Sequence, residues 1–304
     1  MIVCKFGGSA TARKEGIENI KKISQNGARK VLVFSAVGKN NEKDVKLTDL
    51  LINYTNEDNL TKKEFFLEKI NKKLQNLIKL LKISFNIEPF FSQIKSSNNN
   101  AYIISRGEYI TSLLLANYLN IKFLAPEEII FFKNKKFDSR KTKRRLLLNY
   151  QKYGRFVTGG FYGYDSETDS IVLFERGGGD TTGAIISKLL GASVYENYTD
   201  VSGVKPINPK HFYKTKTISK ISYNDMKKLS SYDASVLHKS VCEILSKSSV
   251  ITKVMNIFDI DGKRTIIDNQ THCCNFVCFK ETDKKIDVLL HGEKEMKLSI
   301  KKSP

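Results

Sequence analysis

A lysine beside two glycines is the first feature of this sequence that could perform chemistry. "VCKFGGSA" places Lys5 two residues before the pair Gly7 and Gly8, at the end of an apolar run and just ahead of a helical pattern that begins at Thr11. Backbone amides without side chains can bind phosphate oxygens, and a helix N-terminus adds the positive end of its dipole. Lys5 would add a point charge. The spacing does not match a Walker A loop, and a plain tight turn is the alternative interpretation.

A second glycine-rich turn, "ERGGGDTTGA", carries Arg176 and Asp180 on either side of three glycines at 177–179. We expect a strand to end near Glu175 and a helix to begin near Asp180, so that the freed amides lie at the carboxyl ends of strands, where open α/β sheets bind ligands. The spacing does not fit the dinucleotide fingerprint G-x-G-x-x-G. Together with Lys5, these residues indicate a phosphoryl-transfer site without a histidine base.

The elements that must position these turns alternate between short apolar strands and amphipathic helices. Strands are expected at 2–6 and 30–37, and helices at 11–23, from 46 onward and at 61–82. This alternation is typical of a largely parallel sheet covered on both faces. Thr61 and Glu64 form a capping-box pattern at the start of the last helix.

The pattern changes near residue 258. "TIID", "NFVCF", "KIDVLL" and "MKLSI" read as short strands, with no segment of helix length between them. We therefore expect two units, an α/β domain at 1–258 and a short β-rich extension at 259–304.

Composition narrows the classes of function. The chain has 304 residues, and its formal charge of +19 comes mainly from lysines spread along its whole length. Aromatic residues do not alternate with the basic ones, as they do on surfaces that stack the bases of single-stranded nucleic acid. We therefore expect no specific nucleic-acid partner. The densest basic run, at 133–145, reads as a solvated helix face.

Cysteines and hydropathy predict a soluble cytoplasmic protein. Five cysteines form no disulfide framework, and "HCCNFVC" lacks the second ligand pair of a zinc site. No apolar run reaches the roughly 18 residues of a membrane span, and the N-terminus does not read as a signal peptide, so no membrane partner is expected.

Seven ordered blocks of the sequence resemble the aspartate kinases of the amino-acid kinase superfamily. They are "KFGGSA", "VFSAVGKN…KLTDLL", "SRGEYITSLLLANYL", "FVTGGFYG", "ERGGGDTTGAIISKLLGA", "YTDVSGV" and "DASVLHKSV". The resemblance covers roughly residues 1–258. It implies a three-layer α/β/α sandwich with a largely parallel central sheet, followed by a short strand-rich C-terminal extension, and it implies a homodimer.

The resemblance also implies an activity. Aspartate kinases transfer the γ-phosphate of ATP, with Mg²⁺, to the β-carboxylate of L-aspartate, giving 4-phospho-aspartate for lysine, threonine and methionine biosynthesis. A carboxylate with a reference pKa of about 3.9 is ionised at neutral pH, so no general base is needed.

The resemblance assigns roles to individual residues. Lys5 and Asp180 match the catalytic positions, and Asp180 would either orient Lys5 or hold Mg²⁺ through water; the metal ligands stay undetermined. The positions that match those holding the amino acid are Ser35, Thr48, Glu108 and Arg176. The positions that match the nucleotide site, besides Lys5, are Gly7, Gly8, Ser9, Gly177, Gly178, Thr199 and Asp200.

Several positions depart from the family pattern. Gly179 stands where the family usually has serine, and Asn208 and Lys210 replace an aspartate and an arginine near the nucleotide. The two ACT regulatory modules of the family are expected to be missing or reduced to the strand-rich remnant, which predicts insensitivity to lysine and threonine.

Two other classes of function stay open. The first is an amino-acid kinase relative that acts on another carboxylate or oxyanion, such as glutamate, acetylglutamate or carbamate. The second is a non-catalytic polyanion-binding protein that keeps the fold as a scaffold.

Overall fold

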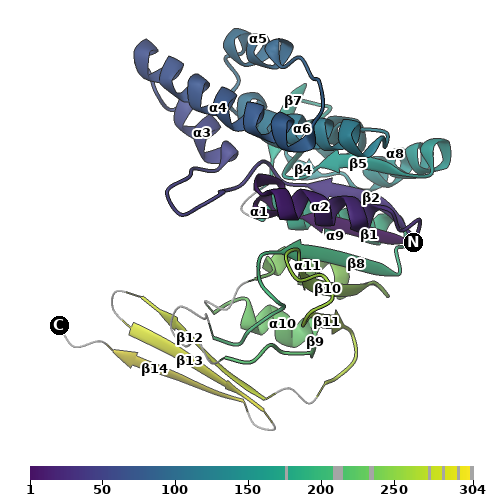
Figure 1. Cartoon of the computed structure of the whole chain (residues 1–304). Helices are drawn as coiled ribbons and strands as arrows, with labels where there is room; N and C mark the ends of the chain where they lie inside the picture. The colour runs from purple at the N-terminus through teal and green to yellow at the C-terminus, as the bar shows by residue number, and fades with distance from the viewer. Residues whose placement is uncertain are drawn as a thin grey trace.

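A seven-stranded sheet forms the centre of the molecule (Figure 1). The computed structural model describes residues 1–174, 177–207, 215–232, 236–272, 275–282, 285–292 and 295–301. The strand order is β5 (Phe156–Gly159), β2 (Arg29–Phe34), β1 (Ile2–Phe6), β8 (Val194–Thr199), β10 (Ile251–Asn256), β11 (Thr265–Asp268) and β9 (Lys220–Ser222). The first five strands are parallel, and β11 pairs antiparallel to β10. The expected largely parallel sheet is confirmed.

Both faces of the sheet are apolar and both are covered by helices. Because side chains alternate along a strand, Cys4 and Phe6 lie on one face and Val3 on the other. The apolar cluster on the first face includes residues of α1 (Gly8–Ala12), α2 (Lys14–Ser24), α3 (Leu47–Thr55), α4 (Leu60–Leu81), α5 (Glu88–Ser96) and α6 (Asn100–Leu119). The second packs against α8 (Ser139–Tyr153), α9 (Gly178–Leu189), α10 (Tyr223–Leu229) and α11 (Lys239–Leu245). The three-layer α/β/α architecture is thereby confirmed.

A small four-stranded sheet lies beside the central one. It contains β4 (Lys136–Phe137), β3 (Phe131–Lys133), β6 (Tyr162–Asp165) and β7 (Ser170–Leu173), and α7 (Pro126–Ile129) leads into it. The strand expected to end near Glu175 is β7. The chain therefore reaches the second glycine turn from this small sheet, not from the central one.

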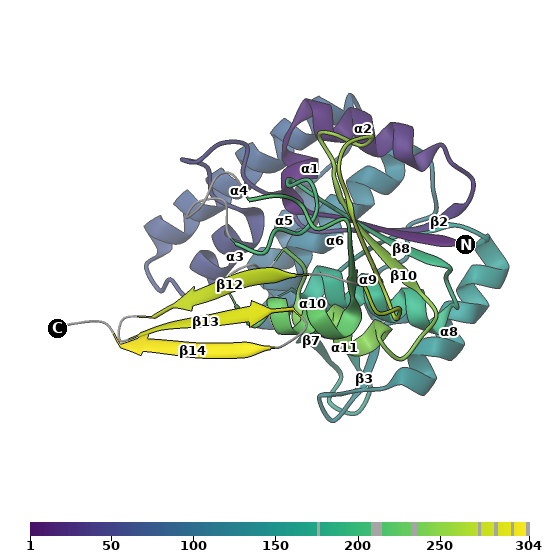
Figure 2. The same ribbon diagram turned by 90° about the horizontal axis from the view of Figure 1, so that it is seen from below.

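The C-terminal strands divide between two sheets. β11, the "TIID" strand, joins the central sheet, whereas β12 (Phe276–Glu281), β13 (Lys285–His291) and β14 (Met296–Lys301) form a separate antiparallel sheet. The far end of this second sheet stands clear of the helices (Figure 2). Among the described residues, the helices are all too short or too polar to cross a membrane.

Two helix boundaries differ from the sequence-based expectation. The helix expected at 11–23 is interrupted at Arg13, whose backbone is extended, with φ −127° and ψ 144°. The helix expected at 61–82 begins one residue earlier, because Asn59 has the extended backbone of an N-cap and its side chain accepts a hydrogen bond of 3.1 Å from the Lys62 N–H. The predicted Thr61–Glu64 capping box is therefore wrong.

This assignment predicts that Asn59→Ala lowers the free energy of unfolding by about 1 kcal/mol, because an orphan N–H of α4 loses its acceptor. Thr61→Ala, two residues away on the same exposed turn, should change it by less than about 0.5 kcal/mol. Urea unfolding of the two variants measures both values. A larger loss for Thr61→Ala than for Asn59→Ala would restore the capping box.

Candidate functional site

A buried ion pair joins the two glycine turns predicted from the sequence. Lys5 lies on the same sheet face as Val3, so its side chain points toward α9, and its Nζ lies 2.7 Å from Oδ1 of Asp180 in the first turn of that helix. Each side chain is 12% exposed. The Asn197 amide, on β8, donates a 3.1 Å hydrogen bond to the same oxygen. The lysine is therefore held in one place before any ligand arrives.

Around this pair, chain segments pack main chain against main chain. The Gly38 N–H donates to the Gly8 carbonyl at 2.8 Å. A Cβ on Gly8 would lie 2.6 Å from the carbonyl oxygen of Ala36, and a Cβ on Gly160 would lie 2.6 Å from Cα of Gly179. Real Cβ atoms do not approach so closely, so these positions require glycine. The contacts gather the ends of β1, β2 and β5 around the start of α9.

The other residues of the first turn surround the lysine. The Gly7 N–H donates to the Tyr198 carbonyl at 3.0 Å, which ties the turn to β8. The position of a Cβ on Gly7 is 3.8 Å from Nζ of Lys5 and 3.9 Å from Oγ of Ser9. Ser35 reaches the same place from β2, because a Cβ on Gly179 would be 2.9 Å from its Oγ and 3.4 Å from Cε of Lys5. The structure thus brings Lys5, Gly7, Ser9 and Ser35 together.

A second part of the site centres on Glu108 of α6, which is 5% exposed and lies against α3 and the chain just after β2. Its Oε1 accepts from the Ala36 N–H and from the Thr48 hydroxyl, both at 3.4 Å. Its Oε2 is buried and has no hydrogen-bond partner among the residues that the structure describes. Burial raises the pKa of Glu108 to about 7, although the two donors act in the opposite direction.

The helix that carries Glu108 is fixed by a buried guanidinium two residues earlier. Arg106 lies 3.0 Å from a carboxylate oxygen of Glu127 and donates to the Tyr162 hydroxyl at 3.3 Å. Its guanidinium also lies over the rings of Tyr102 and Tyr109, at 4.4 and 4.5 Å from their centroids. These contacts tie α6 to β6 and α7, so that Glu108 is held on a rigid support.

The two parts of the site share their boundaries. Residue 35 borders Lys5, and residue 36 donates to Glu108. At the end of β5, a Cβ on Gly159 would lie 3.3 Å from Cβ of Glu108, and the next residue, Gly160, contacts the first turn of α9. The lysine and the buried carboxyl therefore line adjacent halves of one region at the carboxyl edge of the sheet.

The structure describes most of the remaining predicted site residues, but not Arg176. Thr199 ends β8 beside the first turn, and its hydroxyl donates to Oδ1 of Asp200 at 3.2 Å. Gly177 is the N-cap of α9 with φ +80°, and a Cβ there would lie 2.3 Å from the His238 ring. Gly178 starts the helix. Arg176 lies outside the described residues, as do Asn208 and Lys210.

Sequence reasoning missed three contributors to this site. Asn197 is 2% exposed and contacts Asp180, and its signal was a pair of polar residues inside the apolar strand "VYENYT". Gly38 and Gly160 hold the segments together, and both occur in blocks already quoted for the resemblance. Their signal was a glycine a short distance beyond each of two strands, which sequence alone does not separate from an ordinary turn.

The described residues contain no group of three or more histidine, cysteine, aspartate or glutamate side chains arranged to hold a metal ion. Asp180 is the carboxylate nearest to Lys5. Both of its contacts from Lys5 and Asn197 go to Oδ1, and within the described part of the chain Oδ2 accepts no hydrogen bond. One carboxylate oxygen of Asp180 therefore has no hydrogen bond among the described contacts.

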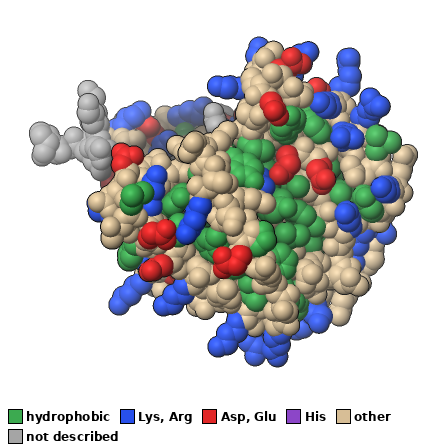
Figure 3. All heavy atoms as spheres, turned by 90° about the horizontal axis from the view of Figure 1, so that it is seen from above, with side chains coloured by type: hydrophobic (Ala, Val, Ile, Leu, Met, Phe, Trp, Pro, Cys, Tyr) green, Lys and Arg blue, Asp and Glu red, His purple; other side chains and the backbone are tan. Residues whose placement is uncertain are grey.

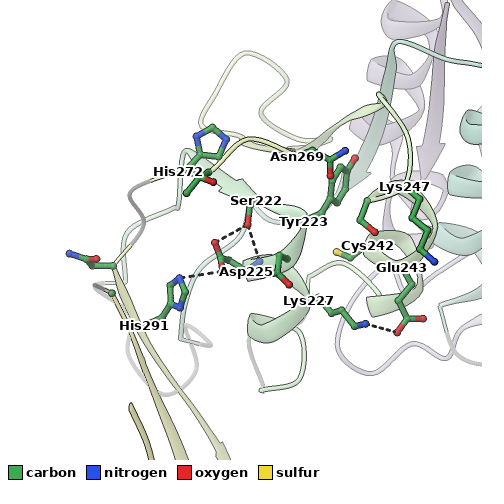
Figure 4. A pocket seen from close by; sticks show the side chains of 15 residues that line it. Ser222, Tyr223, Asp225, Lys227, Cys242, Glu243, Lys247, Asn269, His272 and His291 are labelled. Carbon is green, nitrogen blue, oxygen red and sulfur yellow. Dashed lines mark hydrogen bonds and ion pairs between the residues drawn. The ribbon is translucent and has the colours of Figure 1, made fainter. Parts of the chain in front are cut away.

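A separate cavity of about 810 Å³ lies between α10, α11 and the C-terminal sheet (Figure 4). Its lining includes none of Lys5, Glu108 or Asp180. Many of its polar groups pair with protein groups, as in the contacts Ser222–Asp225 and Lys227–Glu243. The cavity therefore does not belong to the site at the strand ends.

Comparisons with known proteins identify the family of the chain. Residues 1–256 match the model of the amino acid kinase family. Aspartokinase 3 of Bacillus subtilis is 28% identical over 284 residues, which span 84% of this chain and 61% of that protein. The aspartokinase of Chlamydia muridarum is 26% identical over 284 residues, spanning 88% of this chain and 63% of that protein.

Solved structures give the same relationship. The aspartate kinase of Clostridium acetobutylicum is 31% identical, with a TM-score of 0.82, covering 94% of this chain and 67% of that one. Aspartokinase III of Escherichia coli in complex with aspartate and ADP has a TM-score of 0.82 at 16% identity, covering 100% and 79%, and this likeness concerns the fold. The chain spans less than two thirds of the curated relatives named above. The chain belongs to the amino acid kinase family, in which it is related to the aspartate kinases.

Proposed function

We propose that this protein is an aspartate kinase, which transfers the γ-phosphate of ATP to the β-carboxylate of L-aspartate. The observation that carries the proposal is the pairing of a preformed Lys5–Asp180 contact with a buried carboxyl group, Glu108, that has an unpartnered oxygen. The first suits a transferring phosphoryl group, and the second suits the ammonium group of an amino acid. Both lie beside the glycine contacts at the strand ends.

On the phosphate side, catalysis consists of positioning and charge stabilisation. Lys5 is fixed by Asp180, so its ammonium group is already in place when negative charge develops on the oxygens of the transferring group. The first turn of α9 and the turn at Gly8 would present backbone amides to the same region, whereas the Gly7 N–H is used in its hydrogen bond to Tyr198. Little of the binding energy is then needed to reorganise the protein.

On the acceptor side, the substrate supplies its own nucleophile. The β-carboxylate of aspartate is ionised at neutral pH and attacks the γ-phosphorus; the bond to the bridging oxygen of ADP breaks, and an acyl phosphate forms. Oε2 of Glu108 would accept a hydrogen bond from the α-ammonium group, and Ser35 and Thr48 would lie beside that group. Arg176 would bind the α-carboxylate through its guanidinium fork.

The residues fit a Mg²⁺ ion brought in with ATP. Mg²⁺ keeps several waters and needs only one or two protein carboxylates besides the phosphates, and Oδ2 of Asp180 is such a group. When bound, the ion would neutralise charge on the phosphate oxygens. In this proposal, Asp180 both orients Lys5 and contacts the hydration shell of the ion.

The proposal also includes a homodimer and a cytoplasmic location. The free thiols of Cys4, Cys242 and Cys278 are consistent with that location.

The acceptor is tested by a panel of L-aspartate, L-glutamate, N-acetylglutamate and carbamate with MgATP and hydroxylamine, which traps acyl phosphates as hydroxamates. We expect hydroxamate with aspartate and at most a few per cent as much with the others. Equal or greater turnover of another acceptor would show that the protein has a different acceptor specificity within the family.

The polyanion-binding alternative has less support. Lysine and arginine side chains spread around the rim of the face in Figure 3 instead of forming one tract. A scaffold protein would show no ATP turnover with any acceptor, together with salt-sensitive retention on nucleic acid.

Lys5→Ala should lower kcat by more than a factor of ten, above ~1.4 kcal/mol, with a much smaller change in aspartate affinity, because its charge matters most during transfer. Lys14→Ala, which removes an exposed lysine from α2, is the matched control and should keep wild-type kcat. Steady-state kinetics provide both values. A Lys5→Ala enzyme within tenfold of wild type would remove this residue from the mechanism.

Arg176→Lys should raise the KM for aspartate at least about tenfold while kcat changes little, because a point charge cannot replace a bidentate guanidinium. Initial rates against aspartate concentration at saturating MgATP separate the two constants. Wild-type affinity in this variant would show that another group binds the α-carboxylate.

Glu108→Gln should stabilise the free protein above neutral pH. The folded-state pKa of about 7 lies above the ordinary value of 4.5, so the wild-type protein loses stability as pH rises from about 4.5 to 7, by roughly 3 kcal/mol at most. The neutral amide avoids that loss. Thermal unfolding should therefore give a higher Tm for the variant at pH 8 and similar values at pH 4.5.

The same variant should bind aspartate poorly at every pH, because an amide cannot supply the negative charge that the ammonium group needs. In the wild type, aspartate affinity should fall as pH falls below about 7. This role for the carboxyl group would be contradicted if the Tm difference between Glu108→Gln and the wild type were the same at pH 4.5 and at pH 8. Wild-type affinity for aspartate in Glu108→Gln would also contradict it.

A further inference from the structure

The chain makes a long loop, residues 38–46, between β2 and α3 (Figure 1). Its ends are joined by a hydrogen bond of 2.9 Å from the Leu47 N–H to the Val37 carbonyl. At the first end, Gly38 packs on the backbone of Gly8 and donates its N–H to the Gly8 carbonyl at 2.8 Å. The loop therefore begins in the glycine contact of the site and ends at the start of α3.

The two hydrogen-bond donors to Glu108 flank this loop. The Ala36 N–H lies just before it and the Thr48 hydroxyl just after it, and each donates to Oε1 at 3.4 Å. Hydrogen bonds of this length are close to the limit at which they cease to exist, so a small shift at either end of the loop would break them. The surroundings of Glu108 therefore depend on how the loop is held.

Asp44 organises the loop from within. Its Oδ2 accepts from the Asn40 N–H and its Oδ1 from the Val45 N–H, both at 2.8 Å. These bonds fold the tip of the loop back onto its second half and fix the carboxylate. Each carboxylate oxygen has two lone pairs, so Asp44 can still accept from a further donor.

Lys73 of α4 is that further donor. Its Nζ lies 2.7 Å from Oδ2 of Asp44, and its side chain is 9% exposed. The helix is a firm support, because Leu74 and Leu77 beside Lys73 are 0% and 1% exposed in the apolar core. Among the described residues, no other hydrogen bond or ion pair joins the loop to α4.

Packing does not replace this ion pair. A cavity of about 540 Å³ lies beside it, and its lining includes Thr11, Asn40, Asp44 and Lys73. The tip of the loop, residues 39–43, is exposed. A nearly buried ion pair adds little stability over an apolar pair of the same size, but it fixes one geometry. The contact therefore suits a positioning role better than a stabilising one.

We propose that Lys73 is a positioning residue for the reaction: through Asp44 it holds loop 38–46, and the loop keeps the Ala36 and Thr48 donors on Glu108. The inference rests on the proposed function, because it concerns the part of the site that would bind the ammonium group of the substrate. Lys73 acts through the loop, since the cavity that it lines includes neither Lys5 nor Glu108.

Steady-state kinetics test the role. Lys73→Met should raise the KM for aspartate at least about fivefold, the factor expected for one lost hydrogen bond, while kcat changes less than about twofold. Lys73→Arg should restore most of the affinity, because a guanidinium can also reach Asp44. Lys72→Met, at the exposed preceding position of α4, is the matched control and should keep wild-type constants. Unchanged thermal unfolding shows that each variant is folded.

A double-mutant cycle tests whether Lys73 acts through Asp44. Asp44→Asn should raise the KM for aspartate by itself, but should add less than about twofold in the Lys73→Met background. A wild-type KM in Lys73→Met, a loss confined to kcat, or effects of the two substitutions that multiply would each overturn the proposal.

Trypsin cleavage after Lys39 tests the hold on the loop without any substrate, because Asp44 binds the N–H of the next residue, Asn40. Mass spectrometry of the fragments should show this cut at least about fivefold faster in Lys73→Met than in the wild type and in Lys72→Met. Equal rates would overturn the proposal. Faster cleavage in Lys73→Met, together with a wild type that forms no hydroxamate from aspartate, would support the hold on the loop and contradict only the proposed function.

Discussion

The close approach of glycine backbones at the carboxyl edge of the central sheet is the constraint on which the site depends. Gly8 and Gly38, which pack on each other, and Gly160, which packs on the backbone of Gly179, have no room for a Cβ atom. These contacts bring the ends of three neighbouring parallel strands to the first turn of α9. The apolar core already packs α9 on the face of β1 that carries Lys5, and the glycine contacts hold the first turn of α9 at the end of that strand, where Asp180 meets the lysine. The apolar residues on both faces of the sheet stabilise the fold, and the glycines allow the backbone segments to come close enough to form the site.

This shape separates two electrostatic environments within one region. Lys5 and Asp180 neutralise each other and are further fixed by Asn197, so the lysine is ordered in the free protein. Burial raises the pKa of Glu108 toward neutrality, and its two weak donors, with no cation among its described contacts, offset this only in part. The first environment is prepared for a group whose negative charge increases during reaction. The second gains most from a ligand that carries a positive charge.

Much of this arrangement could be predicted from the sequence, because the signals were local. Glycines after an apolar strand and before a helix indicated both turns, and alternation of strands and helices indicated the layered sheet. Asn197 was missed, since its role depends on the pairing of β8 with β1, which brings residues nearly two hundred positions apart side by side. The start of α4 was placed wrongly because Asn59 and Thr61 are both good caps, and backbone conformation decides between them. The junction at "TIID" was also ambiguous, since periodicity does not say which sheet a strand joins.

The central claim is direct transfer of a phosphoryl group to the β-carboxylate, and an isotope measurement tests it most directly. L-aspartate labelled with ¹⁸O in its β-carboxylate is incubated with the protein, MgATP and hydroxylamine, and the phosphate released is analysed by mass spectrometry. Hydroxylamine attacks the acyl carbon, so the oxygen that bridged carbon and phosphorus leaves with the phosphate. The account predicts one ¹⁸O atom in each phosphate, in amounts equal to the hydroxamate formed. Phosphate without ¹⁸O would mean that water, not aspartate, accepts the phosphoryl group, and would contradict the account.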